Sequence, residues 1–425
     1  MWLLLCMIAV FCVLSFAVKL PRGIALFLAG IAGTLLGGYW LPWRDLVEGM
    51  FVFLDPLLIV AAALLFLRML EEAGALRTLR SILLRSTAKS PVAFICSVTL
   101  FLLLPGMMTG LSSSAVLTTG ALTAPLLIDL GVEKRKTGAL IALLAIYGMI
   151  APPINLPVMM LANGVDIPFI GFDKPLLLLT IPPALLTAFG MAYPALRKTK
   201  KQNGSLHLSQ YTEAITSKKI FTLFPLLVVV TLLLLIRIIP QWIHDPGIPA
   251  LFLLGTVLTR PFVSGKQIAK ASILAYRSTL PVAAILVGIG TFLQALALIG
   301  GRGDLVVTTL LMPKALLPVA AAVVMPLFGA LSAFGSATVL GVPILLALLG
   351  GGNEIMVGAA LSLFAGLGDM MPPTALAGTF AAEIVGEKNY LTLLKPALPW
   401  LVVGVGWALL ILWNAKFVGG LLGMH

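Results

Sequence analysis

The segment 147–157 reads YGMIAPPINLP, and the segment 367–378 reads LGDMMPPTALAG. Each places a glycine four residues ahead of two consecutive prolines, Gly148 in the first segment and Gly368 in the second. Proline removes a backbone hydrogen-bond donor and clashes with the preceding helical turn, and glycine weakens a helix. Since both segments lie deep inside long apolar stretches, the chain breaks an apolar helix twice in the same way.

The composition indicates a protein that lies in a membrane. Of the 425 residues, 60% are hydrophobic and only 10% are charged, and the mean hydropathy is +1.10. Apolar runs recur along the whole chain, and each is long enough to cross a hydrocarbon core of roughly 30 Å. The apolar residues come in blocks and do not alternate with polar ones, as they would in a β-barrel. We therefore expect an all-α polytopic protein embedded in a lipid bilayer.

The net charge does not indicate a nucleic-acid partner. The chain has 28 Lys and Arg residues against 16 Asp and Glu residues, a formal charge of +12, but its basic residues cluster in short segments between apolar runs. Such clusters mark the cytoplasmic side of a membrane protein. They lie at 19–22, 68–89, 134–136, 197–219 and 260–277.

Placing these basic segments in the cytoplasm divides the chain into two repeats joined by a cytoplasmic linker, 197–219. Repeat 1 (1–196) has three spans (2–20, 22–40 and 50–69), a surface arm (70–90), an interrupted stretch (91–130), a broken helix (138–162) and a further span (175–196). Repeat 2 (220–425) has three spans (220–240, 248–262 and 279–299), an arm (301–314), an interrupted stretch (315–350), a broken helix (355–385) and a last span (396–414).

The two interrupted stretches are predicted to be re-entrant hairpins. Basic segments flank 91–130 on both sides, so this stretch must enter from the cytoplasm and return to it. Two full spans would also return the chain to the cytoplasm, but the polar interruption PGMMTGLSSSA at the middle of this stretch favours a hairpin whose tip lines a cavity. Counting crossings places the ends of 315–350 on the external side. The repeats therefore run in opposite directions, an inverted topology typical of secondary transporters that bind substrate at broken helices.

Hydroxyl groups gather at these breaks. Serine is a good N-cap, and a half-helix N-terminus at the membrane midplane carries partial positive charge, so the hairpin tips are candidate substrate sites. The alternative is that these small residues only let helices approach closely. The predicted substrate-binding residues are Ser112, Ser113, Ser114, Thr118, Asn155, Ser332, Ser336 and Thr338.

Asp369 is the most distinctive single residue, because it is ionisable and lies inside an apolar span, where such groups are functional by default. The alternative is a carboxylate that caps the turn in GLGDMM. Broken backbone also frees carbonyl groups that suit Na⁺. The predicted Na⁺ ligands are Ser114, Gly148, Pro152, Gly368, Asp369, Pro372 and Thr374. No Arg or Lys is placed at mid-membrane, so we expect half-helix N-termini and hydroxyl groups, instead of a buried cation, to hold an anionic substrate.

The pattern argues against two other functional classes. A membrane enzyme would need clustered His, Asp or Glu residues at one membrane face, and the sequence offers no such cluster. An ion channel is disfavoured because two inverted broken-helix units indicate alternating access. The sequence therefore predicts a transporter and not an enzyme.

Two long segments resemble a known family. The segment 104–157 (LPGMMTGLSSSAVLTTGALTAPLLIDLG…YGMIAPPINLP) is similar to the corresponding region of the large membrane (permease) subunit of TRAP (tripartite ATP-independent periplasmic) transporters. The segment 328–386 (FGALSAFGSATVLGVP…GLGDMMPPTALAGTFAAEIVG) is similar to its second-repeat partner. The order of spans and arms matches over essentially the whole chain.

The resemblance implies an elevator-type importer of organic acids, such as C4-dicarboxylates, that is driven by Na⁺. It implies a multi-pass protein of the bacterial inner membrane with two partners, a periplasmic substrate-binding protein and a small four-helix membrane subunit. Na⁺ is the coupling ion, and no other cofactor is expected. A stand-alone carrier for di- or tricarboxylates, from the wider ion-transporter group, stays open because the first hairpin reads GLSSS where the family usually has a Gly-Ser-Ser type motif.

Overall fold

A computed structural model describes residues 2–87, 90–203, 211, 215–238, 245–349 and 353–423. Across these residues the regular secondary structure is entirely helical. Six of the described helices are long and apolar enough to cross a membrane. They are Trp43–Glu72, Pro91–Thr109, Asp173–Lys201, Ser217–Ile236, Gly265–Leu298 and Leu391–Trp413. The predicted all-α polytopic membrane fold is confirmed.

The described part of the first half contains eleven α-helices. They are α1 (Trp2–Cys12), α2 (Arg22–Leu36), α3 (Trp43–Phe51), α4 (Leu54–Glu72), α5 (Ala75–Thr87), α6 (Pro91–Thr109), α7 (Ser112–Ala115), α8 (Ala121–Asp129), α9 (Lys134–Ile150), α10 (Leu156–Asn163) and α11 (Asp173–Asn203). Of the predicted linker 197–219, the stretches 204–210 and 212–214 lie outside the described residues.

The second half has its elements in a similar order. They are α12 (Ser217–Phe221), α13 (Phe224–Ile238), α14 (Ile248–Thr259), α15 (Gly265–Leu298), α16 (Gly301–Leu310), α17 (Leu317–Gly329), α18 (Ala333–Gly335), α19 (Val342–Leu348), α20 (Glu354–Leu367), α21 (Leu376–Val385), α22 (Leu391–Trp413) and α23 (Ala415–Leu421). Residue 350, the end of the second predicted hairpin, lies outside the described residues.

Each predicted hairpin is broken near its middle. In the first, α6 ends at Thr109, and the next residue, Gly110, has a φ of 65°, a left-handed conformation that glycine adopts without strain. Helix α7 starts after the extended Leu111. In the second, α17 ends at Gly329, and the Ser332 side chain caps α18 by accepting a hydrogen bond from the Gly335 amide. Both returning segments contain a π-helical stretch, Val116–Gly120 and Ser336–Gly341.

The two Pro-Pro motifs interrupt their helices in the same manner. The first lies between α9 and α10, and the second lies between α20 and α21 after a short 3₁₀ turn, Gly368–Met370. Both prolyl-proline peptide bonds are cis. Each apolar helix is therefore divided into two shorter ones that meet at a bent segment.

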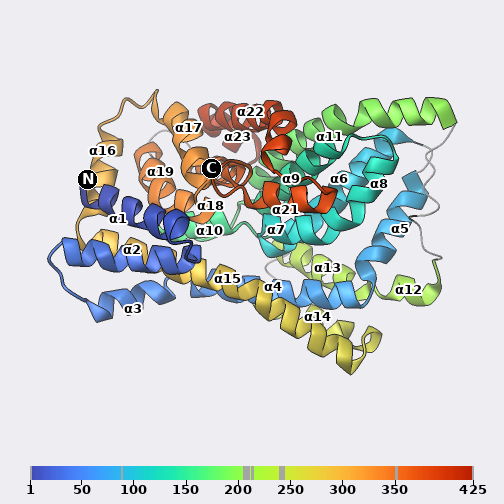
Figure 1. The fold of residues 1–425 in the computed structure, drawn as a ribbon, viewed down its shortest axis with the longest axis horizontal. Helices are drawn as coiled ribbons and strands as arrows, with labels where there is room; N and C mark the ends of the chain where they lie inside the picture. Colours follow the sequence, from blue (N-terminus) through green and yellow to red (C-terminus); the bar gives the residue numbers. More distant parts are fainter. Residues whose placement is uncertain are drawn as a thin grey trace.

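The buried apolar side chains form two cores. One core joins the hairpins and broken helices, chiefly α6, α9, α11, α20 and α22. The other joins α1, α2, α4, α14 and α15 and also includes tip residues such as Leu111 and Phe334. In Figure 1 the long α15 runs below the hairpins and broken helices, with α2, α3 and α4 beside it. The hairpin tips thus meet the second core.

One predicted boundary is wrong. The sequence places a basic loop at 260–277 and a span at 279–299, but α15 is a single helix of 34 residues from Gly265 to Leu298. It begins with a capping box, in which the Ser264 and Gln267 side chains each bond to the other's backbone amide. Lys270 then pairs with Glu72 at the end of α4, at 2.7 Å. The basic residues lie on a helix because a carboxylate and a capping motif there support helical structure.

The inverted topology can be tested by cysteine labelling in cells. Gly303 is exposed on α16, which the crossing count places outside, and Lys201 is exposed at the end of α11, which it places in the cytoplasm. After replacement of Cys6, Cys12 and Cys96, we expect a membrane-impermeant maleimide to label Gly303→Cys in intact cells. Lys201→Cys should react only after permeabilisation. The reverse pattern would contradict the inverted repeats.

Candidate functional site

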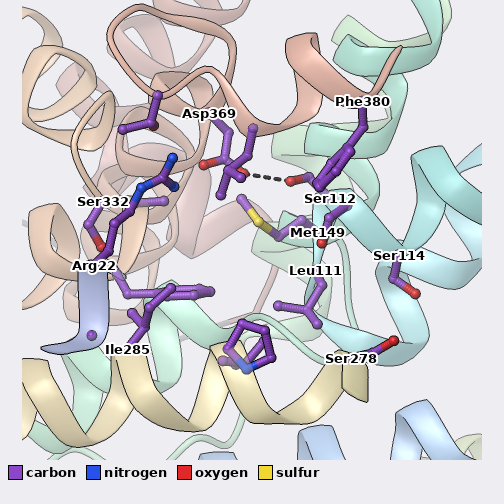
Figure 2. Close-up of a pocket in the computed structure, with 18 of the residues that line it drawn as sticks. Arg22, Leu111, Ser112, Ser114, Met149, Ser278, Ile285, Ser332, Asp369 and Phe380 are labelled. Atoms are coloured by element: carbon purple, nitrogen blue, oxygen red, sulfur yellow. Dashed lines mark hydrogen bonds between the residues drawn. The ribbon is translucent and has the colours of Figure 1, made fainter. Parts of the chain in front are cut away.

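A cavity of about 400 Å³ lies where both hairpin tips and both broken helices meet α2, α4 and α15. The wall includes residues 111–114 of the first hairpin tip and residues 331–334 of the second. Other residues from each half of the chain complete it. Figure 2 shows Ser112, Asp369 and Arg22 near one another in this cavity. The cavity therefore lies between the two apolar cores of the molecule.

The first hairpin tip is bonded to the second broken helix inside this cavity. The Ser112 hydroxyl donates a hydrogen bond of 2.5 Å to Oδ2 of Asp369 (Figure 2). Asp369 lies in the 3₁₀ turn that ends α20, and only 6% of its surface is exposed. A hydrogen bond to a charged acceptor is stronger than one between neutral groups. The bond therefore fixes the position of the carboxylate relative to the tip.

Arg22 supplies the opposite charge from the other core. It is the first residue of α2, and its guanidinium group points toward Asp369 in Figure 2. The two side chains are near enough to interact electrostatically. Among the residues that the structure describes, none forms an ion pair with Arg22. Its hydrogen-bond donors are thus available to an anion in the cavity.

A second arginine lines the cavity but is largely occupied. Arg68 of α4 pairs with Glu71 at 2.8 Å and donates a hydrogen bond of 3.2 Å to the Ser278 hydroxyl of α15. Two polar atoms of the cavity wall are buried without a hydrogen-bond partner in the described part of the chain, the Ser114 hydroxyl and Nε of Arg68. Such buried groups are expected to have a partner that occupies the cavity.

The second hairpin tip is tied to the second broken helix. The Thr374 hydroxyl donates a hydrogen bond of 2.5 Å to the Ala330 carbonyl, and the Thr374 amide donates to the same oxygen at 3.3 Å. Ser332 lines the cavity, but its hydroxyl already caps α18. These bonds satisfy polar groups that the breaks in α17 and α20 would otherwise leave unpaired.

The predicted site residues fall into two groups. Those that line the cavity are Ser112, Ser113, Ser114, Ser332, Asp369 and Thr374. Those that do not appear in the wall of this cavity are Thr118, Gly148, Pro152, Asn155, Ser336, Thr338, Gly368 and Pro372. The structure thus brings the two hairpin tips and Asp369 together around the cavity, whereas the other predicted ligands do not line it.

The polar residues of the second group are bonded within the protein. Asn155 caps α10, since its side chain accepts from the Val158 amide and donates to the Ile150 carbonyl and the Ser362 hydroxyl. Thr118, Ser336 and Thr338 donate to backbone carbonyls of their own hairpins. A ligand role for these four side chains stays a prediction.

Gly148 and Gly368 allow close contact between backbones. A Cβ atom on Gly148 would lie 2.6 Å from the Leu103 carbonyl oxygen, and one on Gly368 would lie 2.3 Å from the Gly329 carbonyl carbon. Real Cβ atoms essentially never come within 3.0 Å of such atoms. Each broken helix therefore packs directly on the first helix of the hairpin from the same half of the chain.

The expectation that no buried Arg or Lys lies beside the hairpin tips needs correction. Arg22 and Arg68 both line the cavity, although the sequence assigns each to a basic segment at the cytoplasmic side. Arg22 and Lys19 have the same appearance in a hydropathy profile, and only the packing of α2 against α15 places Arg22 beside the hairpins. The one local signal for Arg68 is its position within an apolar helix, three residues before Glu71.

The family model for the DctM component of tripartite ATP-independent periplasmic transporters matches residues 5–417. The chain belongs to this family. It is therefore the large membrane subunit of a TRAP-type secondary transporter, a polytopic inner-membrane protein and not an enzyme. The first and second hairpins and both broken helices all lie within the matched region. No curated protein matches the chain at a significant level.

Two solved transporters share the fold. The YdaH transporter of Alcanivorax borkumensis, described as having an unusual topology, superposes with a TM-score of 0.57 at 16% identity and covers 92% of this chain and 97% of its own. Neisseria gonorrhoeae MtrF, described as illuminating a class of antimetabolite efflux pumps, gives a TM-score of 0.62 at 14% identity and covers 93% and 94%. At these identities the similarity concerns the fold alone.

The packing role of the two glycines predicts a loss of stability on substitution. Gly148→Ala and Gly368→Ala should each destabilise the protein by about 1–3 kcal/mol, since the added methyl group forces packed backbones apart. Gly303→Ala and Gly420→Ala are matched controls, because a Cβ atom at either position meets nothing within 4 Å. The unfolding temperature of the purified protein in detergent measures the effect. Equal temperatures for all four variants would contradict this role.

Proposed function

We propose that this subunit imports an organic acid together with Na⁺, in a complex with a small four-helix membrane subunit and a periplasmic substrate-binding protein. The observation that carries the proposal is the juxtaposition of Ser112, Asp369 and Arg22 in a cavity between two apolar cores. Asp369, which follows α20, attracts a cation, and Arg22, at the start of α2, attracts an anion. The helices α20 and α2 belong to different apolar cores. The family membership supports the two partner subunits.

Asp369 is the proposed Na⁺ ligand. Among the described residues, its carboxylate is the one acidic side chain in the wall of the cavity. It lies at the carboxyl end of α20, where helix carbonyl groups carry partial negative charge. Interrupted transporter helices bind Na⁺ through such ends and through unwound backbone. The Ser112 hydroxyl that now donates to Asp369 can rotate and offer its lone pairs to a cation.

Arg22 is the proposed anchor for the substrate carboxylate. A guanidinium group binds carboxylate through two parallel hydrogen bonds, which a hydroxyl group does not match. The Ser113 and Ser114 side chains stand at the start of the returning segment of the first hairpin, and the Ser114 hydroxyl has no partner in the described structure. Both hydroxyls can donate to polar atoms of a bound substrate.

An elevator movement is the proposed route across the membrane. Most of the hairpin and broken-helix side chains share one apolar core, while α1, α2, α4, α14 and α15 share the other, which the hairpin tips and part of α10 contact. If the first core slides along the second, the substrate held at the hairpin tips changes sides, and the contact between Arg22 and Asp369 changes with it. Transport would then be alternating access around one site.

Reconstitution tests the proposal directly. Proteoliposomes that contain this chain, the small subunit and the loaded binding protein should accumulate a labelled organic acid, with C4-dicarboxylates in the first panel, only with an inward Na⁺ gradient. Uptake by this chain alone at the full rate would favour the stand-alone di- or tricarboxylate carrier. Uptake that ignores Na⁺ would contradict the proposed coupling.

The Asp369→Asn variant isolates the cation site. We expect it to raise the Na⁺ concentration for half-maximal uptake by about tenfold or more, because a charged ligand becomes neutral at a buried position. Ser114→Ala should raise this concentration more mildly, since one neutral ligand is lost. Asp55→Asn is the matched control, because Asp55 is an exposed carboxylate at the start of α4. An unchanged Na⁺ dependence in Asp369→Asn would make Asp369 a structural cap.

A further inference from the structure

We infer that the substrate is a monocarboxylate with an apolar body, such as an aliphatic or aryl-substituted acid, instead of a short dicarboxylate or a hydroxylated acid. This inference rests on the proposed function, because it concerns the same cavity and the same anchoring by Arg22. Three properties of the cavity support it: the side chains of its wall, the hydrogen-bonding capacity left in that wall, and its charge.

Apolar side chains surround most of the cavity. They include Leu117, Met149, Ile285, Phe334, Leu376 and Phe380, which come from both hairpins, both broken helices and α15. Several of them are drawn around the same space as Arg22 in Figure 2. Burying apolar surface against such a wall contributes about 0.8 kcal/mol per CH₂ group. The wall favours a substrate whose body is hydrocarbon.

The polar groups of the wall are mostly engaged with each other. Ser112 donates to Asp369, Thr374 donates to the Ala330 carbonyl, and Ser278 accepts from Arg68. In the described structure, this leaves the donors of Arg22, the Ser113 and Ser114 hydroxyls, one nitrogen of Arg68 and the hydroxyl hydrogens of Ser278 and Ser332 for a ligand. These groups suffice for one carboxylate. Because nearly all of the free groups are donors, they suit a carboxylate, which only accepts, better than a substrate hydroxyl group, whose own O–H would lack an acceptor.

The charges of the cavity match one carboxylate. Arg68 is neutralised by Glu71, and the charge of Arg22 is offset by that of Asp369. One Na⁺ at Asp369 therefore leaves a single net positive charge, which one carboxylate neutralises. A second carboxylate would lie in an apolar environment without a counter-charge, which is strongly unfavourable.

The size of the cavity is consistent with a larger body. Its volume of about 400 Å³ falls within the range of roughly 300–1,000 Å³ typical of pockets that enclose drug-sized ligands. A four-carbon acid would leave most of that apolar space without contacts. A six-carbon or aromatic acid would fill more of it and exclude water from Arg22.

A chain-length series tests the inference. Butanoate, pentanoate and hexanoate share one carboxylate and differ by single CH₂ groups, and succinate, glutarate and adipate form the matched dicarboxylate series. Binding to the purified protein is measured by competition with labelled hexanoate, or with labelled succinate where hexanoate does not bind, in Na⁺ and in choline. In Na⁺ we expect about fourfold tighter binding for each added CH₂ of the monocarboxylates, from the free energy per buried CH₂.

Two variants connect this gain to the cavity wall. Phe380→Ser and Ile285→Ser should each reduce the gain per CH₂, while Phe417→Ser should leave it unchanged, because Phe417 is exposed on α23, away from this cavity. Ile285→Ser keeps the test valid if Phe380→Ser fails to fold. Hexanamide, which lacks the charge, should bind at least tenfold more weakly than hexanoate.

The outcomes separate this inference from the proposed function. Na⁺-dependent binding of succinate that is tighter than that of hexanoate, with no gain along the monocarboxylate series, would overturn the inference and leave Na⁺-coupled acid transport standing. If no acid binds in a Na⁺-dependent manner, the proposed function fails, and the inference fails with it.

Discussion

A helix that ends inside a bilayer exposes backbone groups that only other protein groups can satisfy, and this chain has four such interruptions. Backbone groups at these interruptions are hydrogen-bonded to neighbouring protein groups. Thr374 of the second broken helix donates twice to the Ala330 carbonyl at the second hairpin tip, and Asn155 caps α10 after the first Pro-Pro motif. Because backbone can be unwound at this depth only where it is enclosed or lines a cavity, the breaks are gathered in one place. The cavity follows from that constraint.

The two halves solve this backbone problem alike but differ in chemistry. Gly148 and Gly368 both let a broken helix touch the neighbouring hairpin helix. The residue after each glycine lines the cavity in both halves, but it is Met149 in the first and Asp369 in the second. A thioether can pack against a hydrocarbon body, and a carboxylate can hold a cation. The two similar broken helices therefore contribute a charged side chain, Asp369, and an apolar one, Met149, to the same cavity.

Much of the fold could be predicted because its signals are local. Pro-Pro pairs, glycines and consecutive serines inside apolar runs mark the interruptions, and an isolated Asp369 marks the site. The positions that escaped prediction depend on contacts between distant segments. Arg22 faces the cavity only because α2 packs along α15, and the helix through 265–277 depends on a capping box and on the pairing of Lys270 with Glu72. The sequence predicts the Ser336 hydroxyl as a substrate ligand, and in the structure this hydroxyl donates a hydrogen bond to the Met325 carbonyl.

The placement of Arg22 and Asp369 on different cores also suggests why ion and substrate would move together under the proposed function. The empty site is close to neutral, since the two charges offset each other. Na⁺ alone would leave Asp369 neutralised and Arg22 uncompensated, and the acid alone would leave Asp369 uncompensated. Either partly loaded state places a net charge at an apolar boundary, which is costly. The charges at the site balance only in the empty and the fully loaded states. These are the two states in which the site of a coupled carrier must cross the membrane.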